Sequence, residues 1–354
     1  MAFEAVGRAV ERCSLSTNDV IDVTSDSRPF CFDDGVRIRV CAVCTVSALA
    51  MGVGTLARAV SRIRPTRGIR RSIGFFGKLI AVTDLDGIVV MDWGIGGLSV
   101  YNEIRRQMPH LSVIYFSDSG AIPYGKLSAN DLRARLLKII LHFRSLGVEH
   151  FVIACNAASS ALPALEDEFK EEKVNVTGVI EHAIRLVRET AFKNVGVIGG
   201  RRTILSRIYQ GALQTKMRAV RLRIAQPLSA WIEQGETTGR RLNLELGKIL
   251  QPLKSCDAVL LACTHYSAIA AEIQLHVPNA TLLDPAPATA KFIKKNWNFS
   301  VERSAPQNRS QSRSQRRSNS ALTVFMTTGN PAQMKISAKL AFGNRIRKIS
   351  VADF

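Results

Sequence analysis

Two stretches of the chain repeat one pattern that could bring two thiols into one site. Residues 151–159 read FVIACNAAS, and residues 258–266 read AVLLACTHY. Each begins with a run of apolar residues, which is typical of a central parallel strand covered on both faces. Each run then gives Ala-Cys, so Cys155 and Cys263 come at the carboxyl ends of the two strands. Because open α/β sheets bind ligands at those ends, the pattern predicts two thiols across one cleft.

Paired thiols suit proton transfer at a carbon atom from both of its faces. One base removes a proton on one side of a stereocentre, and a second group returns a proton on the other side. A thiol has an ordinary pKa of about 8.5, which lies near working pH and can be tuned lower. Either cysteine alone would also suit a structural role, because free cysteine is among the most buried residue types. The shared context of Cys155 and Cys263 favours the catalytic interpretation.

His265 follows Cys263 by two places and indicates a group that tunes the nearby thiol. Zinc binding by this pair would need further ligands at suitable spacing, and the sequence lacks them, so no metal is predicted. A cysteine–histidine hydrolase is an alternative, but it would leave Cys155 without a role.

The first expected strand spans residues 87–92, and a glycine-rich turn follows it. Residues 94–97 read GIGG and lead into a helix that is expected to begin near Leu98. Glycines let the backbone approach a ligand closely, and the start of a helix favours an anion such as a carboxylate. The turn is not the dinucleotide fingerprint, because Ser99 stands where the third glycine would be. Asp92, at the end of the strand, makes this turn a candidate part of the site.

Five motifs occur in the order that they take in the glutamate racemase family, within the aspartate/glutamate racemase superfamily. They are MDWGIGGLSV at 91–100, IPYG at 122–125, ACN at 154–156, GVIE at 178–181 and ACTHY at 262–266. The chain resembles that family from about residue 87 to its C-terminus. The resemblance implies a cofactor-independent interconversion of L-glutamate and D-glutamate, which would supply D-glutamate for the peptidoglycan of the cell wall.

The resemblance also assigns roles to individual residues. It implies that Cys155 and Cys263 are the acid and the base, and that they exchange roles with the direction of reaction. Asp92 and His265 would poise these thiols and also contact the substrate. The other implied substrate contacts are Trp93, Tyr124, Gly125, Asn156, Ala157, Thr264 and Glu181. Glutamate is the implied small-molecule partner, and a homodimer is one possible assembly.

Two positions depart from the family pattern. Trp93 stands where the family usually has serine, and Ala157 stands where it usually has threonine. Each lost hydroxyl would remove a hydrogen bond worth about 1.5–3 kcal/mol when its partner is charged. The alternatives are therefore a racemase of another amino acid, such as aspartate, or a catalytically impaired racemase-like binding protein. His265 favours glutamate, because aspartate racemases tend to carry an acidic residue after the second Cys-Thr.

Strands alternate with helices along the matched region, which predicts an α/β protein with two doubly wound parallel sheets. The expected strands include residues 176–180 and 346–351. The resemblance implies a discontinuous first domain with pseudo-two-fold similarity to the second, and an active site in the cleft between them. The predicted domains are 85–181 plus 286–354 for the first and 182–285 for the second.

Composition sets the remaining limits. The 354 residues carry a formal net charge of +19, with arginines concentrated outside the matched motifs. Such charge is typical of solvated segments, and nucleic-acid binding is not predicted because no module for reading bases accompanies it. Residues 1–84 are predicted to be a poorly ordered extension and residues 299–320 a polar surface loop. An apolar run at 40–57 could instead mark a membrane span, which we do not favour. The free thiols predict a cytoplasmic location.

Overall fold

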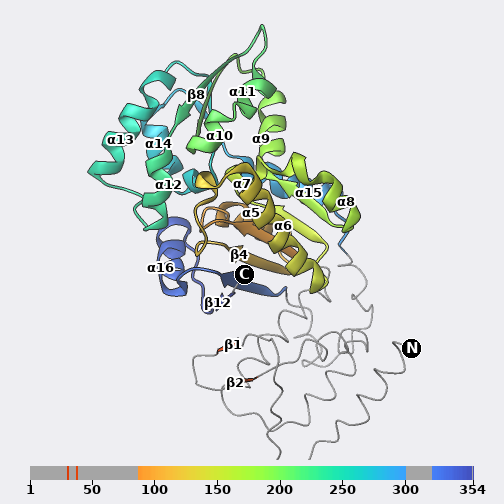
Figure 1. Ribbon diagram of the computed structural model, residues 1–354. Helices are drawn as coiled ribbons and strands as arrows, with labels where there is room; N and C mark the ends of the chain where they lie inside the picture. The colour runs from red at the N-terminus through yellow and green to blue at the C-terminus, as the bar shows by residue number, and fades with distance from the viewer. Residues whose placement is uncertain (1–29, 32–36, 39–86, 300–320, 353) are drawn as a thin grey trace, which may run out of the picture. The chain divides into compact units, whose positions relative to one another are not determined.

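Figure 1 shows the computed structural model, which describes residues 30–31, 37–38, 87–299, 321–352 and 354. The chain divides into two units, Met1–Ile73 and Gly74–Phe354. In the first unit, β1 (Phe30–Cys31) pairs with β2 (Arg37–Ile38) in antiparallel fashion. Apart from these short strands and residue 299, the predicted extension, its apolar run and the predicted polar loop lie outside the described residues.

The second unit is built on two parallel sheets. The six-stranded sheet has the order β12 (Ser350–Val351), β11 (Thr323–Thr327), β4 (Val113–Ser117), β3 (Ile88–Asp92), β5 (His150–Ile153) and β6 (Asn175–Gly178). The four-stranded sheet has the order β8 (Ala219–Ile224), β7 (Asn194–Gly199), β9 (Ala258–Ala262) and β10 (Thr281–Leu283). All neighbouring strands in both sheets pair in parallel. We call each sheet with its helices a lobe.

Four strands follow the same order in both lobes. The sheet order β4-β3-β5-β6 in the six-stranded lobe corresponds to β8-β7-β9-β10 in the four-stranded lobe. In each case the chain moves from its first strand to one side and then crosses to the other side. Ligands of α/β sheets bind at such switch points, outside the carboxyl ends of the strands. The predicted α/β class with parallel sheets is confirmed, whereas the pseudo-two-fold similarity and the domain boundaries stay predictions.

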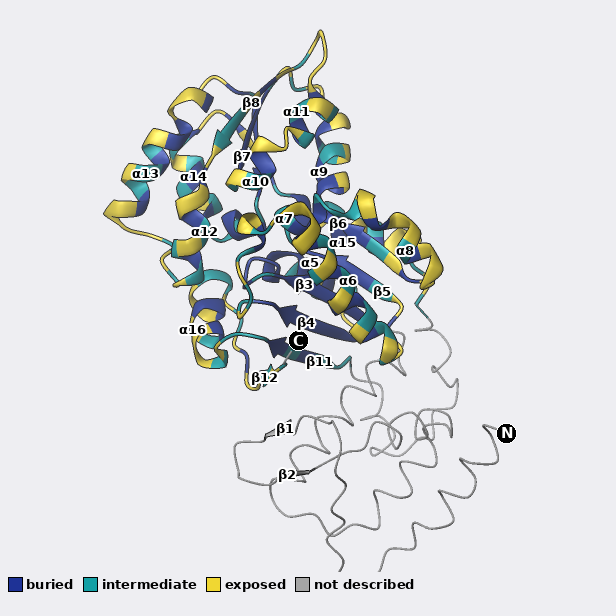
Figure 2. Cartoon of the chain, in the orientation of Figure 1, coloured by how far each residue is buried: buried dark blue, intermediate teal, exposed yellow. Residues whose placement is uncertain are grey.

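Helices cover both sheets, and Figure 2 shows buried strands beneath helices whose outer faces are exposed. Those between β3 and β7 are α5 (Leu98–Gln107), η1 (Tyr124–Lys126), α6 (Ala129–Ser145), α7 (Asn156–Ser159), η2 (Leu162–Leu165), α8 (Glu166–Glu171) and α9 (Val179–Arg188). Those between β7 and β9 are α10 (Arg201–Leu205), α11 (Ile208–Leu213), α12 (Gln226–Glu233), α13 (Arg240–Leu250) and η3 (Gln251–Leu253). The last four are η4 (Thr264–Ile269), α14 (Ala270–His276), α15 (Pro285–Asn296) and α16 (Pro331–Phe342).

The two lobes share one hydrophobic core. Alternate residues of a strand point to opposite faces of its sheet. On β3, Val90 joins the shared core, while Val89 and Met91 pack into a core that belongs to the six-stranded lobe. On β9, Leu261 joins the shared core and Leu260 packs into a core of the four-stranded lobe. Because these strands are buried on both faces, they hold both sheets in place. They also fix the positions of the carboxyl ends of β3, β5 and β9.

Two expected strands differ from the structure. The strand expected at 176–180 ends at Gly178, because the chain turns there against α7. A Cβ at Gly178 would lie 2.7 Å from Ser159 Oγ, and the Val179 N–H donates a hydrogen bond of 3.1 Å to the same oxygen. Glu181 therefore lies in the first turn of a helix, not at the end of a strand.

The strand expected at 346–351 is reduced to β12, Ser350–Val351. Ile346 and Ile349 pack into the shared core and make no part of the strand ladder. None of the helices that the structure describes has the length and apolar character that a membrane crossing requires.

Candidate active site

Asp92 ends β3 and is held by the glycine turn that follows it. Its Oδ1 accepts a hydrogen bond of 2.7 Å from the Trp93 N–H, and its Oδ2 accepts one of 2.6 Å from the Gly97 N–H. A Cβ at Gly97 would lie 2.9 Å from the Asp92 Cβ, so the turn needs glycine there. Burial raises the pKa of Asp92, and the nearby His265 only partly offsets this effect. The carboxyl group is thus fixed in place, with a pKa above the ordinary aspartate value.

Cys155 follows β5 and precedes the first residue of α7. Its side chain is half-buried and lies close enough to Asp92 for each group to shift the pKa of the other. Burial raises the pKa of the Cys155 thiol well above its ordinary value, and the negative charge of Asp92 raises it further. The charge of Cys263 acts on this pKa in the same direction, which means that the two thiols share one electrostatic environment.

Cys263 occupies the corresponding place after β9, before the first residue of η4. Its Sγ lies 3.7 Å from His265 Nδ1. Thr264 Oγ1 donates a hydrogen bond of 3.5 Å to Asp92 Oδ2. The structure therefore brings together Asp92, Cys155, Cys263, Thr264 and His265 near the carboxyl ends of β3, β5 and β9.

Glu233 is part of this cluster, although no sequence pattern predicts it. It is the last residue of α12, and its Oε1 lies 2.6 Å from His265 Nε2. The same oxygen accepts a hydrogen bond of 2.6 Å from the Ile95 N–H. A Cβ at Gly94 would lie 1.8 Å from Glu233 Oε1. The glycine turn, where the sequence pattern favours an anion, therefore binds the carboxylate of Glu233.

His265 is buried between this carboxylate and Cys263. Burial alone would lower the pKa of His265, but its hydrogen bonds to Cys263 and Glu233 outweigh burial and raise that pKa well above the ordinary value. A Cβ at Gly96 would lie 2.3 Å from His265 Nδ1, so the ring needs glycine in the turn beside it. The contacts of His265 therefore favour the protonated form of the imidazole next to one thiol.

Asn156, directly after Cys155, has an amide nitrogen without a partner. Its Oδ1 accepts a hydrogen bond of 2.5 Å from the hydroxyl of Tyr209, on α11 of the other lobe. Burial raises the pKa of Tyr209, so this hydroxyl stays a donor. Asn156 Nδ2 and Ser117 Oγ are the buried side-chain polar atoms without a hydrogen bond among the described residues. Ser117 pairs with Asp92 in register across β3 and β4. An unpaired buried donor costs about 1–3 kcal/mol, which favours a ligand acceptor at this place.

Tyr124 and Gly125 lie in η1, after β4. The Tyr124 hydroxyl donates a hydrogen bond of 2.8 Å to Asp118 Oδ2, and Arg135 Nε donates one of 2.9 Å to the same oxygen. The Tyr124 side chain therefore supports its own loop. A Cβ at Gly125 would meet no atom within 4 Å, so open space lies beside this residue.

The two departures from the family pattern behave differently. Trp93 is half-buried, and its Nε1 donates a hydrogen bond of 2.9 Å to the Ala121 carbonyl oxygen. Its indole packs against the core of the six-stranded lobe. Ala157 lies in α7 and is half-buried, so a larger side chain there would meet partly open space.

Glu181 is a predicted site residue whose described contacts do not join it to the thiols. Its carboxylate accepts a hydrogen bond from Thr177 Oγ1 and lies 3.1 Å from His182 Nε2. Burial works to raise the pKa of Glu181, but the hydrogen bonds from His182 and Thr177 outweigh it, so the pKa is lowered. Its side chain is 60% exposed, on the first turn of α9.

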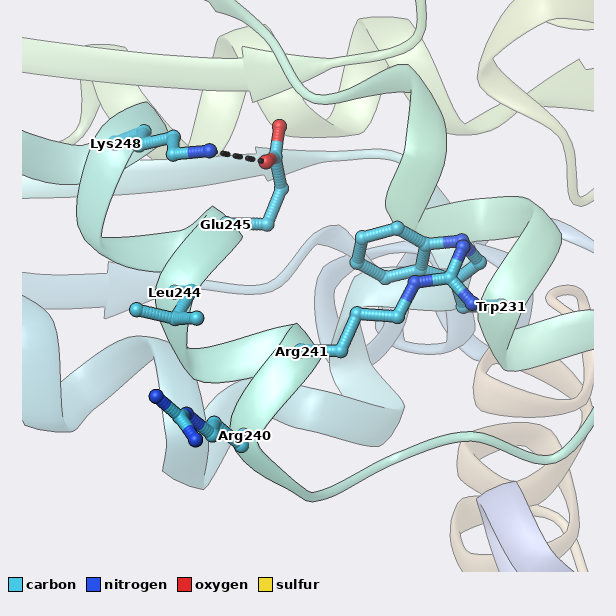
Figure 3. Close-up of a pocket in the computed structure, with 6 residues that line it drawn as sticks. All are labelled: Trp231, Arg240, Arg241, Leu244, Glu245 and Lys248. Carbon is cyan, nitrogen blue, oxygen red and sulfur yellow. Dashed lines mark ion pairs between the residues drawn. The ribbon is translucent and has the colours of Figure 1, made fainter.

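A separate hollow of about 550 Å³ lies on α12 and α13 (Figure 3) and shares no lining residue with the thiol cluster. The Arg241 guanidinium lies 4.1 Å from the centre of the Trp231 ring, and Lys248 pairs with Glu245 at 3.7 Å. The charged groups of Arg241, Lys248 and Glu245 therefore already have partners within the hollow. Within the described ranges, no group of three or more His, Cys, Asp or Glu side chains is arranged to hold a metal ion.

The part of the chain that carries this site also matches known proteins. The sequence model of one family, described as Asp/Glu/Hydantoin racemase, matches residues 88–293. The chain is 39% identical over 210 residues to the glutamate racemase of Mycobacterium tuberculosis, covering 58% of this chain and 76% of that protein. It is 40% identical to the glutamate racemase of Mycobacterium leprae, with the same coverage.

Two solved structures resemble the fold. Glutamate racemase from Thermus thermophilus, in complex with β-chloro-D-alanine, has a TM-score of 0.63 and 28% identity, covering 76% of this chain and 97% of that one. Glutamate racemase from Escherichia coli, in complex with L-glutamate and the activator UDP-MurNAc-Ala, has a TM-score of 0.56 and 26% identity. It covers 75% of this chain and 97% of that one.

Proposed function

This chain belongs to the Asp/Glu/hydantoin racemase family, and we propose that it interconverts L-glutamate and D-glutamate by proton transfer between two thiols. The chain is accordingly an enzyme of the isomerase class. The observation that carries the mechanism is the convergence of the segments after β5 and β9 on Asp92. The Thr264 hydroxyl donates a hydrogen bond to Asp92, and Cys155 lies close enough to Asp92 for each group to shift the pKa of the other.

In the proposed reaction, one sulfur acts as thiolate and takes the α-proton of glutamate. The C–H electron pair stays on the substrate as a carbanion, and the opposite sulfur delivers its thiol proton to the other face. The two sulfurs have then exchanged protonation states, and exchange with water restores the starting form. Asp92 beside Cys155 and His265 beside Cys263 hold the protons in position for these transfers.

The substrate's charged groups need partners in this mechanism. The free Nδ2 of Asn156 suits a carboxylate oxygen, which accepts such a donor strongly. The chain's own residues thus supply the donors and both acid/base groups, and we propose that no cofactor takes part. We further propose that the product D-glutamate serves peptidoglycan synthesis and that the enzyme works in the cytoplasm, where thiols stay reduced.

Purified protein incubated with L-glutamate in deuterated water, without added cofactor, tests this proposal. Chiral chromatography should show D-glutamate that carries deuterium at its α-carbon, because the added proton comes from a thiol that has exchanged with solvent. Retention of protium in the product, or no product in either direction, would contradict the two-thiol mechanism.

A racemase of another amino acid, such as aspartate, is a second candidate because Trp93 and Ala157 alter the expected substrate contacts. A panel of L-amino acids under the same conditions separates the two. Faster deuterium incorporation into aspartate than into glutamate would favour the alternative. Binding of an amino acid without deuterium exchange would indicate a racemase-like binding protein.

A further inference from the structure

Arg202 joins the two lobes at the loop that carries Tyr124 and Gly125. It lies on α10, which follows β7 of the four-stranded lobe. Its Nε donates a hydrogen bond of 3.2 Å to the Tyr124 carbonyl oxygen, and a terminal guanidinium nitrogen donates to the Leu127 carbonyl oxygen. Both acceptors belong to the six-stranded lobe. The planar guanidinium can reach two such carbonyls at once, because its donors have a fixed fork geometry.

The other described hydrogen bonds to this loop, residues 118–127, come from the six-stranded lobe. Trp93 Nε1 donates to the Ala121 carbonyl oxygen, and Thr328 Oγ1 accepts from the Gly120 N–H at 2.9 Å. Asp118 is held by Arg135 and by the Tyr124 hydroxyl. These bonds fix the base of the loop to its own sheet. The two carbonyl contacts of Arg202 therefore set the position of η1 relative to the opposite lobe.

This loop lies next to the thiol site. Helix α7, which begins after Cys155, packs against both η1 and α10. Burial raises the pKa of Tyr124 well above its ordinary value, and the negative charges of Asp118 and Cys155 add to the effect. Open space lies beside Gly125. A shift of η1 away from α10 would change the width of the site at this point.

We propose that Arg202 is a positioning residue for the racemisation, a latch that holds η1 against the opposite lobe when the site is closed. The role rests on the proposed function for its kinetic consequences, but not for its structural ones. Arg202 touches no thiol among the contacts described, so it acts on the substrate through the Tyr124–Gly125 backbone. Loss of the latch should weaken substrate binding more than it slows proton transfer.

Three variants test this role in the full-length chain. Arg202→Ala removes both hydrogen bonds, and Arg202→Lys retains the charge but not the fork. Arg201→Ala is the matched control, because Arg201 is exposed on the same helix and its described hydrogen bond uses only its backbone N–H, to Gln226. Hydrogen–deuterium exchange of peptides covering 119–127 is measured together with kcat and KM for glutamate and with the melting temperature.

In Arg202→Ala we expect amide exchange in the loop to accelerate by about tenfold, because hydrogen bonds from a charged donor are among the stronger ones. KM for glutamate should rise by a similar factor of about ten, while kcat changes less than about threefold. Arg202→Lys should recover part of the protection, and Arg201→Ala should match the wild type in every measurement.

The amide exchange result and the kinetic result can each contradict a proposal independently of the other. Unchanged loop exchange in a folded Arg202→Ala protein would overturn the latch, whatever the activity. Loss of kcat at constant KM would also overturn it, because it would place Arg202 in the chemistry. Accelerated loop exchange in a chain that does not racemise glutamate would support the latch and contradict the proposed function instead.

Discussion

The Cys155 side and the Cys263 side of the site share a backbone but differ in their charged partners. Cys155 follows β5, which pairs with β3, and Cys263 follows β9, which pairs with β7. Each cysteine has an extended backbone and precedes a short helix. Beside Cys155 lies Asp92, a buried carboxyl whose pKa is raised by burial. Beside Cys263 lies His265, whose pKa is raised by its hydrogen bonds to Cys263 and Glu233 despite burial. A reaction with mirror-related substrates is thus served by two chemically different sides.

This difference separates what the fold supplies from what the side chains supply. The repeated strand order places a sulfur at each carboxyl end, which gives access from two directions. The partners then decide how each sulfur holds its proton. Because the two enantiomers have equal free energy, kcat/KM must be the same in both directions in every variant. The asymmetry of the site can therefore appear only in kcat and KM taken separately.

The largest expected effect tests whether both sides are needed. Cys155→Ala and Cys263→Ala should each lower racemisation by about a thousandfold or more, because each removes the only sulfur on one face. Cys256→Ala is the matched control, since Cys256 is buried just before β9 and outside the site. Chiral analysis of glutamate turnover checks all three. Substantial activity in either single variant would show that one side suffices.

The second prediction asks whether the two sides act independently. Asp92→Asn and His265→Gln should each reduce kcat/KM by about a hundredfold, since each removes a proton-handling group. Each variant should lose more kcat in the direction in which its neighbouring thiol removes the α-proton. The ratio of the two kcat values should therefore move in opposite senses, as followed by circular dichroism from each enantiomer. Movement in the same sense would mean that Asp92 and His265 serve one thiol.

Much of this site could be predicted from the sequence, for reasons that particular residues make clear. The runs before Cys155 and Cys263 are apolar on both faces, which is typical of central parallel strands, so each cysteine could be placed at a strand end where ligands bind. Glu233 could not be predicted. It lies 32 residues before His265 on a helix end, where an acidic residue looks like any surface glutamate.

The end of β6 shows the other limit of sequence patterns. Val179 and Ile180 are apolar and β-branched, which favours a strand. The chain nevertheless turns at Gly178, because Ser159 packs against that glycine and accepts a hydrogen bond from the next N–H. A long-range contact of this kind leaves no trace in the local pattern. Glu181 was expected at a strand end and instead lies on a helix turn with Thr177 and His182 as partners.

A smaller effect is expected at Glu233, which contacts His265 directly on the Cys263 side and reaches the Cys155 side only through the glycine turn. Glu233→Gln removes the charge that helps to raise the pKa of His265, so that pKa should fall. The imidazole would then lose its proton at lower pH, and the alkaline limb of the kcat/KM profile should move to lower pH. Activity at neutral pH should fall by about tenfold, and a shift to higher pH would contradict the assignment.

Stability should follow the same sign. A raised pKa of His265 means that its pairing with Glu233 stabilises the fold fully below the ordinary histidine pKa and less as pH rises through the raised value. Urea unfolding of Glu233→Gln should therefore differ most from the wild type near pH 6 and least at alkaline pH. Glu236→Gln, in an exposed 3.7 Å pair with Arg241, should show little difference at either pH.

The smallest effect concerns the second position after each cysteine, where one side has His265 and the other has Ala157. Ala157→Thr adds a hydroxyl in α7, at a half-buried position. A hydroxyl that reaches a charged group of glutamate should raise kcat/KM by about threefold to tenfold. Ala157→Val has nearly the same shape without the hydroxyl, so it should give no gain. An equal gain in both variants would trace the effect to packing. A loss in both would mean that the site needs the small alanine side chain at this position.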